Sequence, residues 1–174
     1  MHFRLDRYES PIGTILLVTD DEGALRALDF GDYEARMHCL LRRYYGDFEL
    51  RPEPAPANIP HALDRYFAGQ LDALDGLAVA TAGTPFQRQV WRALREIPPR
   101  VACSYGQLAA QIGRPGASRA VGAANGSNPV AIVVPCHRVI GADGSLTGYG
   151  GGMIRKRWLL DHEAGQATMP VAAR

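Results

Sequence analysis

The sequence predicts an α/β protein of the α+β kind: a small N-terminal domain built on an antiparallel sheet, then a mainly helical C-terminal domain with a helix-turn-helix. Three observations predict it. Alternating apolar and polar residues open the chain, helix-capping patterns begin near residue 84, and the net charge changes sign between the halves. A chain of 174 residues can hold two small domains that share a core. We place them at residues 1–82 and 83–174.

The first domain begins with three predicted strands. Residues 3–8, 14–18 and 24–30 have the composition of half-buried strands, and an acidic turn ending at Gly23 joins the last two. Residues 32–45 carry apolar side chains at helical spacing. Four prolines in residues 51–60 predict an extended connection, and a short helix is expected over 61–67. Nothing in this half groups residues that could do chemistry, so it is interpreted as a structural domain.

The second domain starts with two capping patterns. Thr84-Pro85-Phe86-Gln87 has the spacing of a capping box with proline at the first helical position, and this helix should stop at Pro98. Ser104-Tyr105-Gly106-Gln107 repeats the pattern ahead of a short helix. After a turn at 113–116, residues 117–124 can form another helix that Asn125-Gly126 would end. The two short helices form the predicted helix-turn-helix.

Charge and cysteine content restrict the class of protein. Residues 1–82 hold 8 Arg against 14 Asp and Glu, and residues 83–174 hold 11 Lys and Arg against 4 acids, so the second half suits a polyanion. The three cysteines have no CxxC spacing, and Cys39 with His2, His38 and His61 lacks an ordered ligand pattern, so no metal is predicted. No apolar run approaches the roughly 20 residues of a membrane span, and no secretory signal opens the chain. A cytoplasmic protein is expected.

A cysteine and a histidine stand side by side after the apolar run of residues 130–134. The run leads into Pro135-Cys136-His137. The thiolate is the nucleophilic form of cysteine, and a neighbouring imidazole can take its proton, so the pair predicts a cysteine nucleophile. Glu163 is a candidate third member that orients His137. The alternative is a buried structural cysteine beside an unrelated histidine.

Two further segments indicate what this nucleophile meets. Tyr149-Gly150-Gly151-Gly152 lacks the spacing of a phosphate loop, and its glycines would let the backbone come close to a flat ligand. Residues 117–124 are nearly all small, with Arg119 as the one long cation and no Asn or Gln to read base edges. Such a helix suits a protein that inspects DNA of any sequence, although close packing against another helix would also explain it.

The segment Val133-Val134-Pro135-Cys136-His137-Arg138-Val139-Ile140 resembles the active-site signature of the O6-alkylguanine-DNA alkyltransferases, also called methylated-DNA–protein-cysteine methyltransferases. The blocks that begin at Thr84, Ser104, Arg114, Asn125 and Trp158 resemble those of the family in the same order, so the resemblance covers nearly all of residues 83–163. The acidic first half, with Tyr66-Phe67-Ala68-Gly69, resembles the N-terminal domain of the stand-alone bacterial enzymes.

The resemblance implies DNA repair by an irreversible single-turnover reaction. Cys136 would attack the alkyl carbon of an O6-alkylguanine flipped out of the duplex and keep the alkyl group as a thioether. His137 would deprotonate Cys136 through a water, and Glu163 would hold His137. Asn128 would brace the turn, and Tyr105 would donate to the ring of the leaving guanine.

The resemblance also assigns the contacts to DNA and to the base. The DNA contacts are Arg119, Ser118, Ala120 and Gly122, and the contacts to the flipped base are Val139, Tyr149 and Gly150. Arg119 would fill the gap left by the flipped nucleotide. The implied partner is double-stranded DNA that contains O6-alkylguanine, bound by a monomer without strong sequence preference, with no cofactor and no membrane. O4-alkylthymine remains open as a second substrate.

Two departures from the family pattern affect the expected pocket. Gly150 stands where some members have Ser, and Asn125 stands where some have a long apolar residue. Together they predict a roomier pocket that admits alkyl groups larger than methyl.

Three other functions use parts of the same sequence. A Cys-His-Glu hydrolase would need an oxyanion hole and leaves Arg119 unexplained. An alkyltransferase-like recognition module would lack the nucleophile, and Cys136 is present. A transcription regulator would need a base-reading helix or a sensing domain. The alkyltransferase is the hypothesis that accounts for all the motifs.

Overall fold

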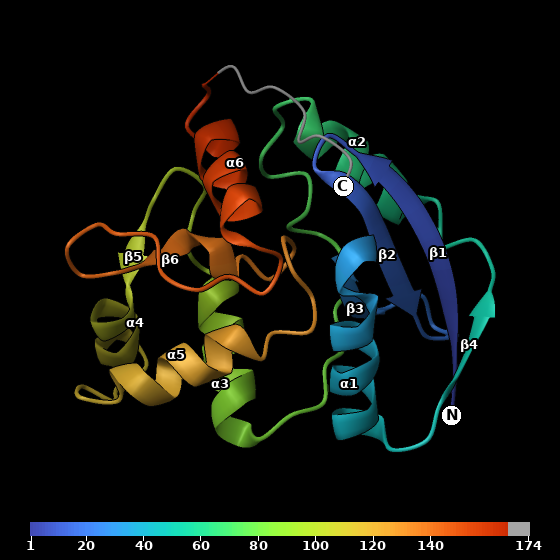
Figure 1. Ribbon diagram of the computed structural model, residues 1–174, viewed down its shortest axis with the longest axis horizontal. Helices are drawn as coiled ribbons and strands as arrows, with labels where there is room; N and C mark the ends of the chain where they lie inside the picture. The colour runs from blue at the N-terminus through green and yellow to red at the C-terminus, as the bar shows by residue number, and fades with distance from the viewer. Residues whose placement is uncertain (167–174) are drawn as a thin grey trace.

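The computed structural model describes residues 1–166 and arranges them in a sheet lobe and a helical lobe (Figure 1). The sheet contains β1 (His2–Ser10), β2 (Gly13–Thr19), β3 (Leu25–Phe30) and β4 (Glu49–Pro52), in the order β3-β2-β1-β4. The three predicted strands pair antiparallel, but β4 was not predicted and pairs parallel with β1. The sheet is therefore antiparallel over the three predicted strands and mixed as a whole, because it gains a parallel strand that was not predicted. Pro52 fits there because β4 is an edge strand.

Two helices cover opposite faces of this sheet. After the short helix η1 (Gly31–Tyr33), α1 (Glu34–Tyr45) packs Met37 and Leu41 into one small core with Leu16 and Val18 of β2. On the other face, α2 (Asn58–Phe67) buries a stripe at helical spacing, which consists of Ile59, Ala62, Leu63 and Tyr66. Alternate residues of β2 point to the two faces, so this strand is buried on both sides. The prediction of the second helix was correct in type but three residues short at its start.

The helical lobe contains four helices and two short strands. The helices are α3 (Pro85–Arg95), α4 (Tyr105–Gln111), α5 (Ser118–Gly126) and α6 (Met153–Glu163), and the strands are β5 (Cys103–Ser104) and β6 (Val139–Ile140). A single 3₁₀ turn, η2 (Cys136–Arg138), precedes β6. Both predicted capping boxes are present, with Thr84 at α3 and Ser104 at α4. α4 and α5 form the predicted helix pair.

The end of α5 differs from the prediction. The helix continues through Asn125 and Gly126 instead of stopping before them, and the Ser127 N–H still bonds to the Ala123 carbonyl. Asn125 is buried on this last turn, where it faces the active-site segment rather than solvent. Tertiary contact therefore overrides the tendency of Asn-Gly to end a helix.

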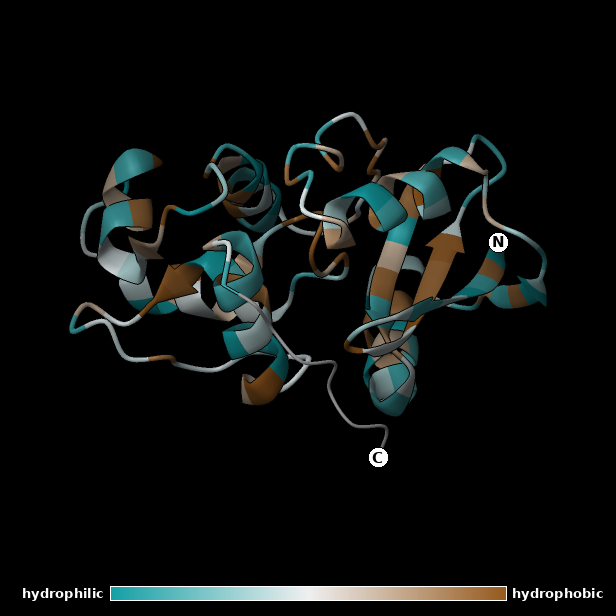
Figure 2. Cartoon of the chain, turned by 90° about the horizontal axis from the view of Figure 1, so that it is seen from above, coloured by the Kyte–Doolittle hydropathy of each residue, from teal (hydrophilic) through white to brown (hydrophobic). Residues whose placement is uncertain are grey.

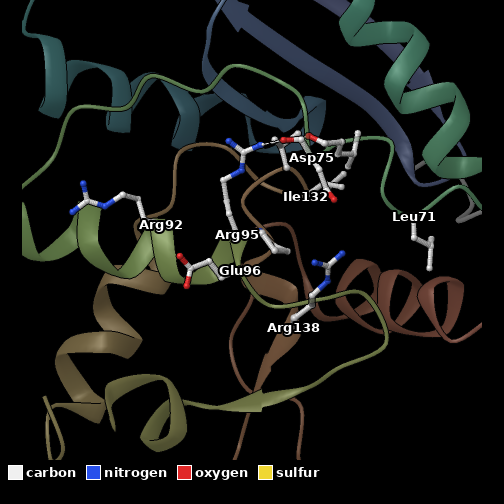
Figure 3. A pocket seen from close by; sticks show the side chains of 10 residues that line it. Leu71, Asp75, Arg92, Arg95, Glu96, Ile132 and Arg138 are labelled. Carbon is white, nitrogen blue, oxygen red and sulfur yellow. Dashed lines mark hydrogen bonds between the residues drawn. The ribbon is translucent and has the colours of Figure 1, made fainter. Parts of the chain in front are cut away.

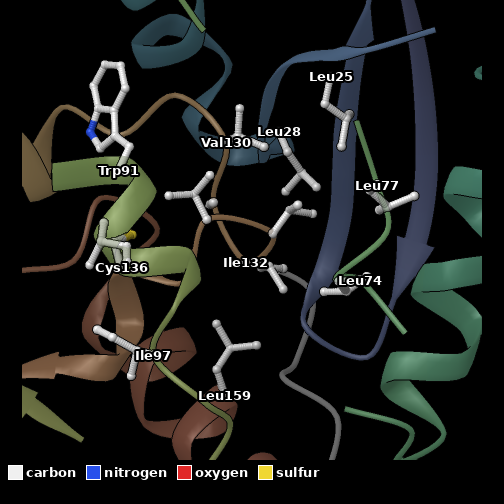
Figure 4. Close-up of a cluster of buried hydrophobic side chains, with 14 of the residues drawn as sticks. Leu25, Leu28, Leu74, Leu77, Trp91, Ile97, Val130, Ile132, Cys136 and Leu159 are labelled. Carbon is white, nitrogen blue, oxygen red and sulfur yellow. The ribbon is translucent and has the colours of Figure 1, made fainter. Parts of the chain in front are cut away.

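The two lobes share one apolar core. Leu25, Leu28 and Leu77 from the sheet lobe meet Trp91 and Ile132 from the helical lobe (Figure 4). The hydropathy of the chain agrees with this arrangement, since apolar residues concentrate on the inner strands while the helices alternate in character (Figure 2). Within residues 1–166, no helix combines the length and apolar character that crossing a membrane requires.

One edge of the sheet lies along β3, and other parts of the chain cover it. The Leu25 N–H bonds to the Ala78 carbonyl at 2.9 Å, which brings the connection between the lobes against one end of β3. At the other end, the Leu28 N–H bonds to the Pro129 carbonyl at 2.9 Å and the Leu28 carbonyl accepts from Ala131 at 3.0 Å. Residues 129–131 begin the segment that leads to Cys136, so the sheet directly positions that segment.

Candidate active site

The approach to Cys136 is a tightly turned segment rather than a strand. At Ile132 the backbone has φ of 68°, and a bond of 2.8 Å from the Val133 N–H to the Ala131 carbonyl closes a γ-turn. A second bond of 2.8 Å, from the Cys136 N–H to the Val134 carbonyl, closes another turn. A positive φ at a β-branched residue costs about 1–3 kcal/mol, so it persists only where the surroundings determine it. Burial of the Ile132 side chain and the backbone hydrogen bonds that join residues 129–131 to Leu28 of β3 provide that support.

Asn128 fixes the same segment from inside. Its side-chain N–H donates to the Val134 carbonyl at 2.8 Å, and its carbonyl oxygen accepts from the Val130 N–H at 3.0 Å. Asn125, at the end of α5, donates to the Cys136 carbonyl at 3.4 Å. Two buried amide side chains therefore hold the corner in one conformation. This is the position that the sequence reasoning expected for Asn128.

His137 and Glu163 form a buried hydrogen-bonded pair. His137 Nε2 lies 2.7 Å from Glu163 Oε1, and both side chains are almost fully buried. A carboxylate can only accept, so Nε2 carries the proton and Nδ1 of the neutral ring keeps its lone pair. Within residues 1–166, this buried Nδ1 has no hydrogen-bond partner. Burial lowers the pKa of His137, and Glu163 partly opposes that shift. The resting imidazole is therefore a neutral base whose free nitrogen can take a proton.

Glu163 has two more partners that the sequence reasoning missed. Arg138 grips it with two bonds, from Nε to Oε2 at 2.9 Å and from Nη2 to Oε1 at 2.8 Å. The Tyr66 hydroxyl donates to Oε1 at 2.8 Å. Burial favours a raised pKa for Glu163, but His137 and Arg138 outweigh it and hold the pKa well below its usual range. Arg138 lies inside the recognised signature. Tyr66 lies in the Tyr66-Phe67-Ala68-Gly69 block of the resemblance, but no local pattern indicates its contact with Glu163, which is 97 residues away.

Cys136 is protonated at rest. It is 6% exposed, and burial raises its pKa, while the Asn128 side chain and the charges of Arg36 and Lys156 lower it in part. Lys156 is itself fully buried and donates to the Val139 carbonyl at 2.6 Å and to the Thr147 carbonyl at 2.7 Å. A buried thiol of raised pKa needs a base at the moment of attack. The neighbouring His137 is the group placed to supply it.

Two further buried polar atoms near Cys136 have no partner among the described residues. They are the Tyr149 hydroxyl and the Asn125 side-chain oxygen. Burial raises the pKa of Tyr149, and the electrostatic effect of Cys136 adds to it. Buried polar groups normally find a partner, so unsatisfied atoms beside a nucleophile indicate a ligand site. The role of Tyr149 in lining a pocket stays a prediction.

A side chain at position 150 would meet Arg36. A Cβ there would overlap the guanidinium of Arg36, which pairs with the buried Asp29 at 2.9 Å. Arg36 therefore fills the space that a side chain at 150 would occupy. The expectation of a roomier pocket at Gly150 and Asn125 stays a prediction.

The predicted DNA-contacting residues lie on α5. Arg119 and Ala120 are exposed there, whereas Ser118 and Gly122 are half-buried. The ring of Tyr105 sits beside Gly122, since a Cβ at 122 would lie 3.8 Å from it. The Tyr105 hydroxyl accepts from Thr147 at 2.9 Å, which leaves its own proton free to donate. Tyr105 thus connects α5 to the loop that carries Tyr149.

A separate cavity of about 360 Å³ opens between α3 and residues 71–75 (Figure 3). Its charged lining comes from Asp75, Arg92, Arg95, Glu96 and Arg138. Neither Cys136 nor Tyr149 lines it, so it is not the place where a reacting base would sit. Among residues 1–166 as a whole, no group of three or more His, Cys, Asp and Glu side chains could hold a metal ion.

Comparison with known proteins gives a consistent picture over both lobes. Residues 85–165 match the model of the 6-O-methylguanine DNA methyltransferase DNA binding domain, and residues 4–81 match that of its ribonuclease-like domain. The chain is 52% identical over 160 residues to a methylated-DNA–protein-cysteine methyltransferase of Salmonella typhimurium, covering 91% of this chain and 94% of the relative. A crystal structure of Mycobacterium tuberculosis OGT in complex with DNA superposes with a TM-score of 0.78 at 44% identity, covering 96% and 95% of the two chains.

Proposed function

The chain belongs to the 6-O-methylguanine DNA methyltransferase family, and from this premise we propose that it repairs O6-alkylguanine in double-stranded DNA by moving the alkyl group irreversibly to its own Cys136. The observation that carries the proposal is the buried Cys136-His137 corner, with His137 hydrogen-bonded to Glu163 at 2.7 Å and its other nitrogen unpartnered among the described residues. A protonated thiol, an adjacent neutral base and a fixed carboxylate are the parts that nucleophilic attack requires.

The reaction balances with these residues alone. The Cys136 sulfur forms a bond to the alkyl carbon as the bond from that carbon to O6 of guanine breaks. The thiol proton passes through water to Nδ1 of His137, where Glu163 stabilises the imidazolium. The leaving guanine takes a proton at its ring from the hydroxyl of Tyr105, whose oxygen already accepts from Thr147, and the thiol proton held by His137 returns through water to restore the phenol. The thioether is stable, so each molecule reacts once.

We further assign the remaining side chains around the corner. Asn128 braces the turn, and Tyr149, Gly150 and the Val139 carbonyl hold the flipped base. The Val139 carbonyl already accepts from Lys156 and keeps a second lone pair for the exocyclic amine of guanine. Removing the base from the stack is necessary because a buried thiol cannot reach an alkyl carbon inside the duplex.

The DNA is proposed to lie against α5. Residues 85–126 carry six arginines and the single acid Glu96, a charge balance that suits phosphate contacts of any sequence. Arg119 is exposed on the outer face of α5 and is assigned to the gap left by the flipped nucleotide. Ser118, Ala120 and Gly122 are small enough to let the helix lie close to the backbone.

Mass spectrometry of the protein after incubation with a duplex that contains one O6-methylguanine tests the function. The expected result is one added methyl on the Cys136 peptide, with uptake ceasing at one equivalent. Cys136→Ala should bind the duplex and take up nothing, whereas Cys39→Ala, at an exposed thiol on α1, should react like the wild type. Intact protein that binds the lesion without gaining a methyl would reduce the proposal to damage recognition.

The assignment of Arg119 has its own test. Arg119→Ala should slow repair of the duplex more than reaction with free O6-alkylguanine, because only the duplex requires flipping. Equal losses on the two substrates would contradict this assignment without affecting that of Cys136.

A further inference from the structure

Tyr66 brings the sheet lobe into direct contact with the proton relay. It stands at the end of the apolar stripe of α2, fully buried, and its hydroxyl reaches Glu163 Oε1 at 2.8 Å. Its backbone carbonyl accepts from His162 Nε2 at 2.8 Å, so α6 holds the residue at two points. The ring of Tyr66 also meets the His162 ring edge-on, with centroids 5.3 Å apart. The hydroxyl therefore has one well-defined position.

The oxygen that Tyr66 contacts is the one that serves His137. Glu163 Oε1 accepts from His137 at 2.7 Å, from Arg138 at 2.8 Å and from Tyr66 at 2.8 Å, whereas Oε2 accepts from Arg138 at 2.9 Å. Each hydrogen bond to a carboxylate stabilises its charged form and makes it a weaker base. Because Tyr66 and His137 donate to the same oxygen, the bond from Tyr66 weakens the hydrogen bond that this oxygen accepts from His137.

We propose that Tyr66 is a positioning residue of the relay, which weakens the basicity of Glu163 and thereby keeps His137 neutral and able to accept the proton of Cys136. The inference rests on the proposed alkyl transfer and adds to it a part for the sheet lobe. Without the Tyr66 donor, Glu163 is a stronger hydrogen-bond acceptor for the Nε2 proton of His137. It then stabilises the imidazolium in the resting protein. A ring that is already protonated cannot take the thiol proton.

Tyr66 can act as a donor over the whole working range. Burial, together with the neighbouring Glu163 charge, raises its pKa well above the ordinary value, so the phenol stays protonated. The charged groups that act on His137 are Glu163, Arg138 and Lys156, of which only Glu163 favours the imidazolium. Tyr66 acts on the one group that raises the proton affinity of His137.

The ring nitrogen resonances of His137, followed by NMR across about pH 5 to 9 with labelled histidine, test this directly. Tyr66→Phe removes the hydroxyl and keeps the ring. We expect the midpoint of the His137 titration to move up by about half a pH unit, the size of shift that one hydrogen bond to the carboxylate supports. The acidic limb of the single-turnover alkyl-transfer profile should move in the same direction by a similar amount.

Tyr44→Phe is the matched control. The Tyr44 hydroxyl also crosses between the lobes, donating to the Ser127 carbonyl at 3.0 Å, but it does not contact the relay. This variant loses a similar bond and should titrate like the wild type. Site-specific replacement of Tyr66 by 3-fluorotyrosine keeps the fold and makes the phenol a stronger donor, so it should shift the midpoint downward.

The outcomes separate this inference from the function itself. A wild-type protein that transfers no alkyl group would refute the function, yet the NMR titrations would still measure the effect of Tyr66 on His137. If His137 titrates at the same pH in all variants, or stays in one form throughout in all of them, the proposal is overturned. Equal shifts in Tyr44→Phe and Tyr66→Phe would also overturn it, since they would reflect a general loosening between the lobes.

Discussion

Breaking the ion pair between Arg138 and Glu163 should cost several times more stability than breaking a pair of equal length nearer the surface. The closest nitrogen and oxygen atoms are 2.8 Å apart, and the side chains are 8% and 2% exposed. Removal of one partner leaves the other as a charge in the core, which costs about 3–5 kcal/mol. Arg138→Met should therefore lower the free energy of unfolding by about that amount. The hydrogen bonds that His137 and Tyr66 still donate to Glu163 reduce this cost.

The pair of Arg26 and Asp20 provides the comparison. Its atoms are also 2.8 Å apart, but the side chains are 26% and 13% exposed. Solvent can replace much of the lost interaction, so Arg26→Met should cost about 1 kcal/mol. The difference between the two variants then measures burial rather than bond length.

Urea unfolding of the wild type, the two arginine variants, Glu163→Gln and the double variant Arg138→Met/Glu163→Gln measures these costs. Because both single variants leave an uncompensated group, the double variant should cost less than the sum by about 1–3 kcal/mol. Additive losses, or an Arg138→Met variant as stable as Arg26→Met, would refute the view that Glu163 depends on Arg138 for its burial.

Three further changes have defined outcomes. Gly150→Ser should displace the Arg36 guanidinium from the buried Asp29 and lower the free energy of unfolding by about 1–3 kcal/mol, whereas Gly148→Ser, whose Cβ would meet nothing within 4 Å, should be as stable as the wild type; equal urea midpoints for the two variants would show that Arg36 makes room at no cost. Thr84→Ala should lower the free energy of unfolding by about 1 kcal/mol because it removes the capping box of α3, and an unchanged urea midpoint would count against it. The pKa of Glu163 is depressed below its ordinary value of 4.5, so its contribution to stability is complete above that pH and is lost as the pH falls further. As the pH is lowered from about 6 to 3, the free energy of unfolding should therefore decrease more steeply in the wild type than in Glu163→Gln. Parallel curves of this free energy against pH would argue against a charged Glu163 in the folded protein.

Local patterns predicted the parts of this fold that local forces decide. The capping boxes at Thr84 and Ser104 are satisfied within four residues, so their chemistry is visible in the sequence. The strands β1 and β3 follow from the alternation of residues 3–8 and 24–30 for the same reason. In contrast, β4 pairs with β1 across more than 40 residues and ends in Pro52, so neither strand propensity nor alternation predicts it.

The candidate site divides in the same way. Cys136 and His137 are adjacent in the sequence, so a cysteine nucleophile with a neighbouring base could be predicted from the sequence. Glu163 could be suggested as a third member, but its distance to His137 depends on how α6 packs. Tyr66 and Arg36 come from the sheet lobe, and only the packing of α2 and α1 brings them to the site. Interactions between distant segments leave no periodic trace in a sequence.

The cover over β3 has a consequence for attempts to separate the lobes. In the whole chain, residues 78–80 and 129–131 pair with backbone groups of β3 near Leu25 and Leu28. A fragment ending at residue 82 would lose the second of these covers and expose unpaired N–H and C=O groups next to Leu28, which is fully buried in the whole protein. An exposed apolar strand edge is a template for pairing with other chains. Such a fragment should self-associate and precipitate, so the segment that carries the nucleophile also keeps the sheet lobe from aggregating.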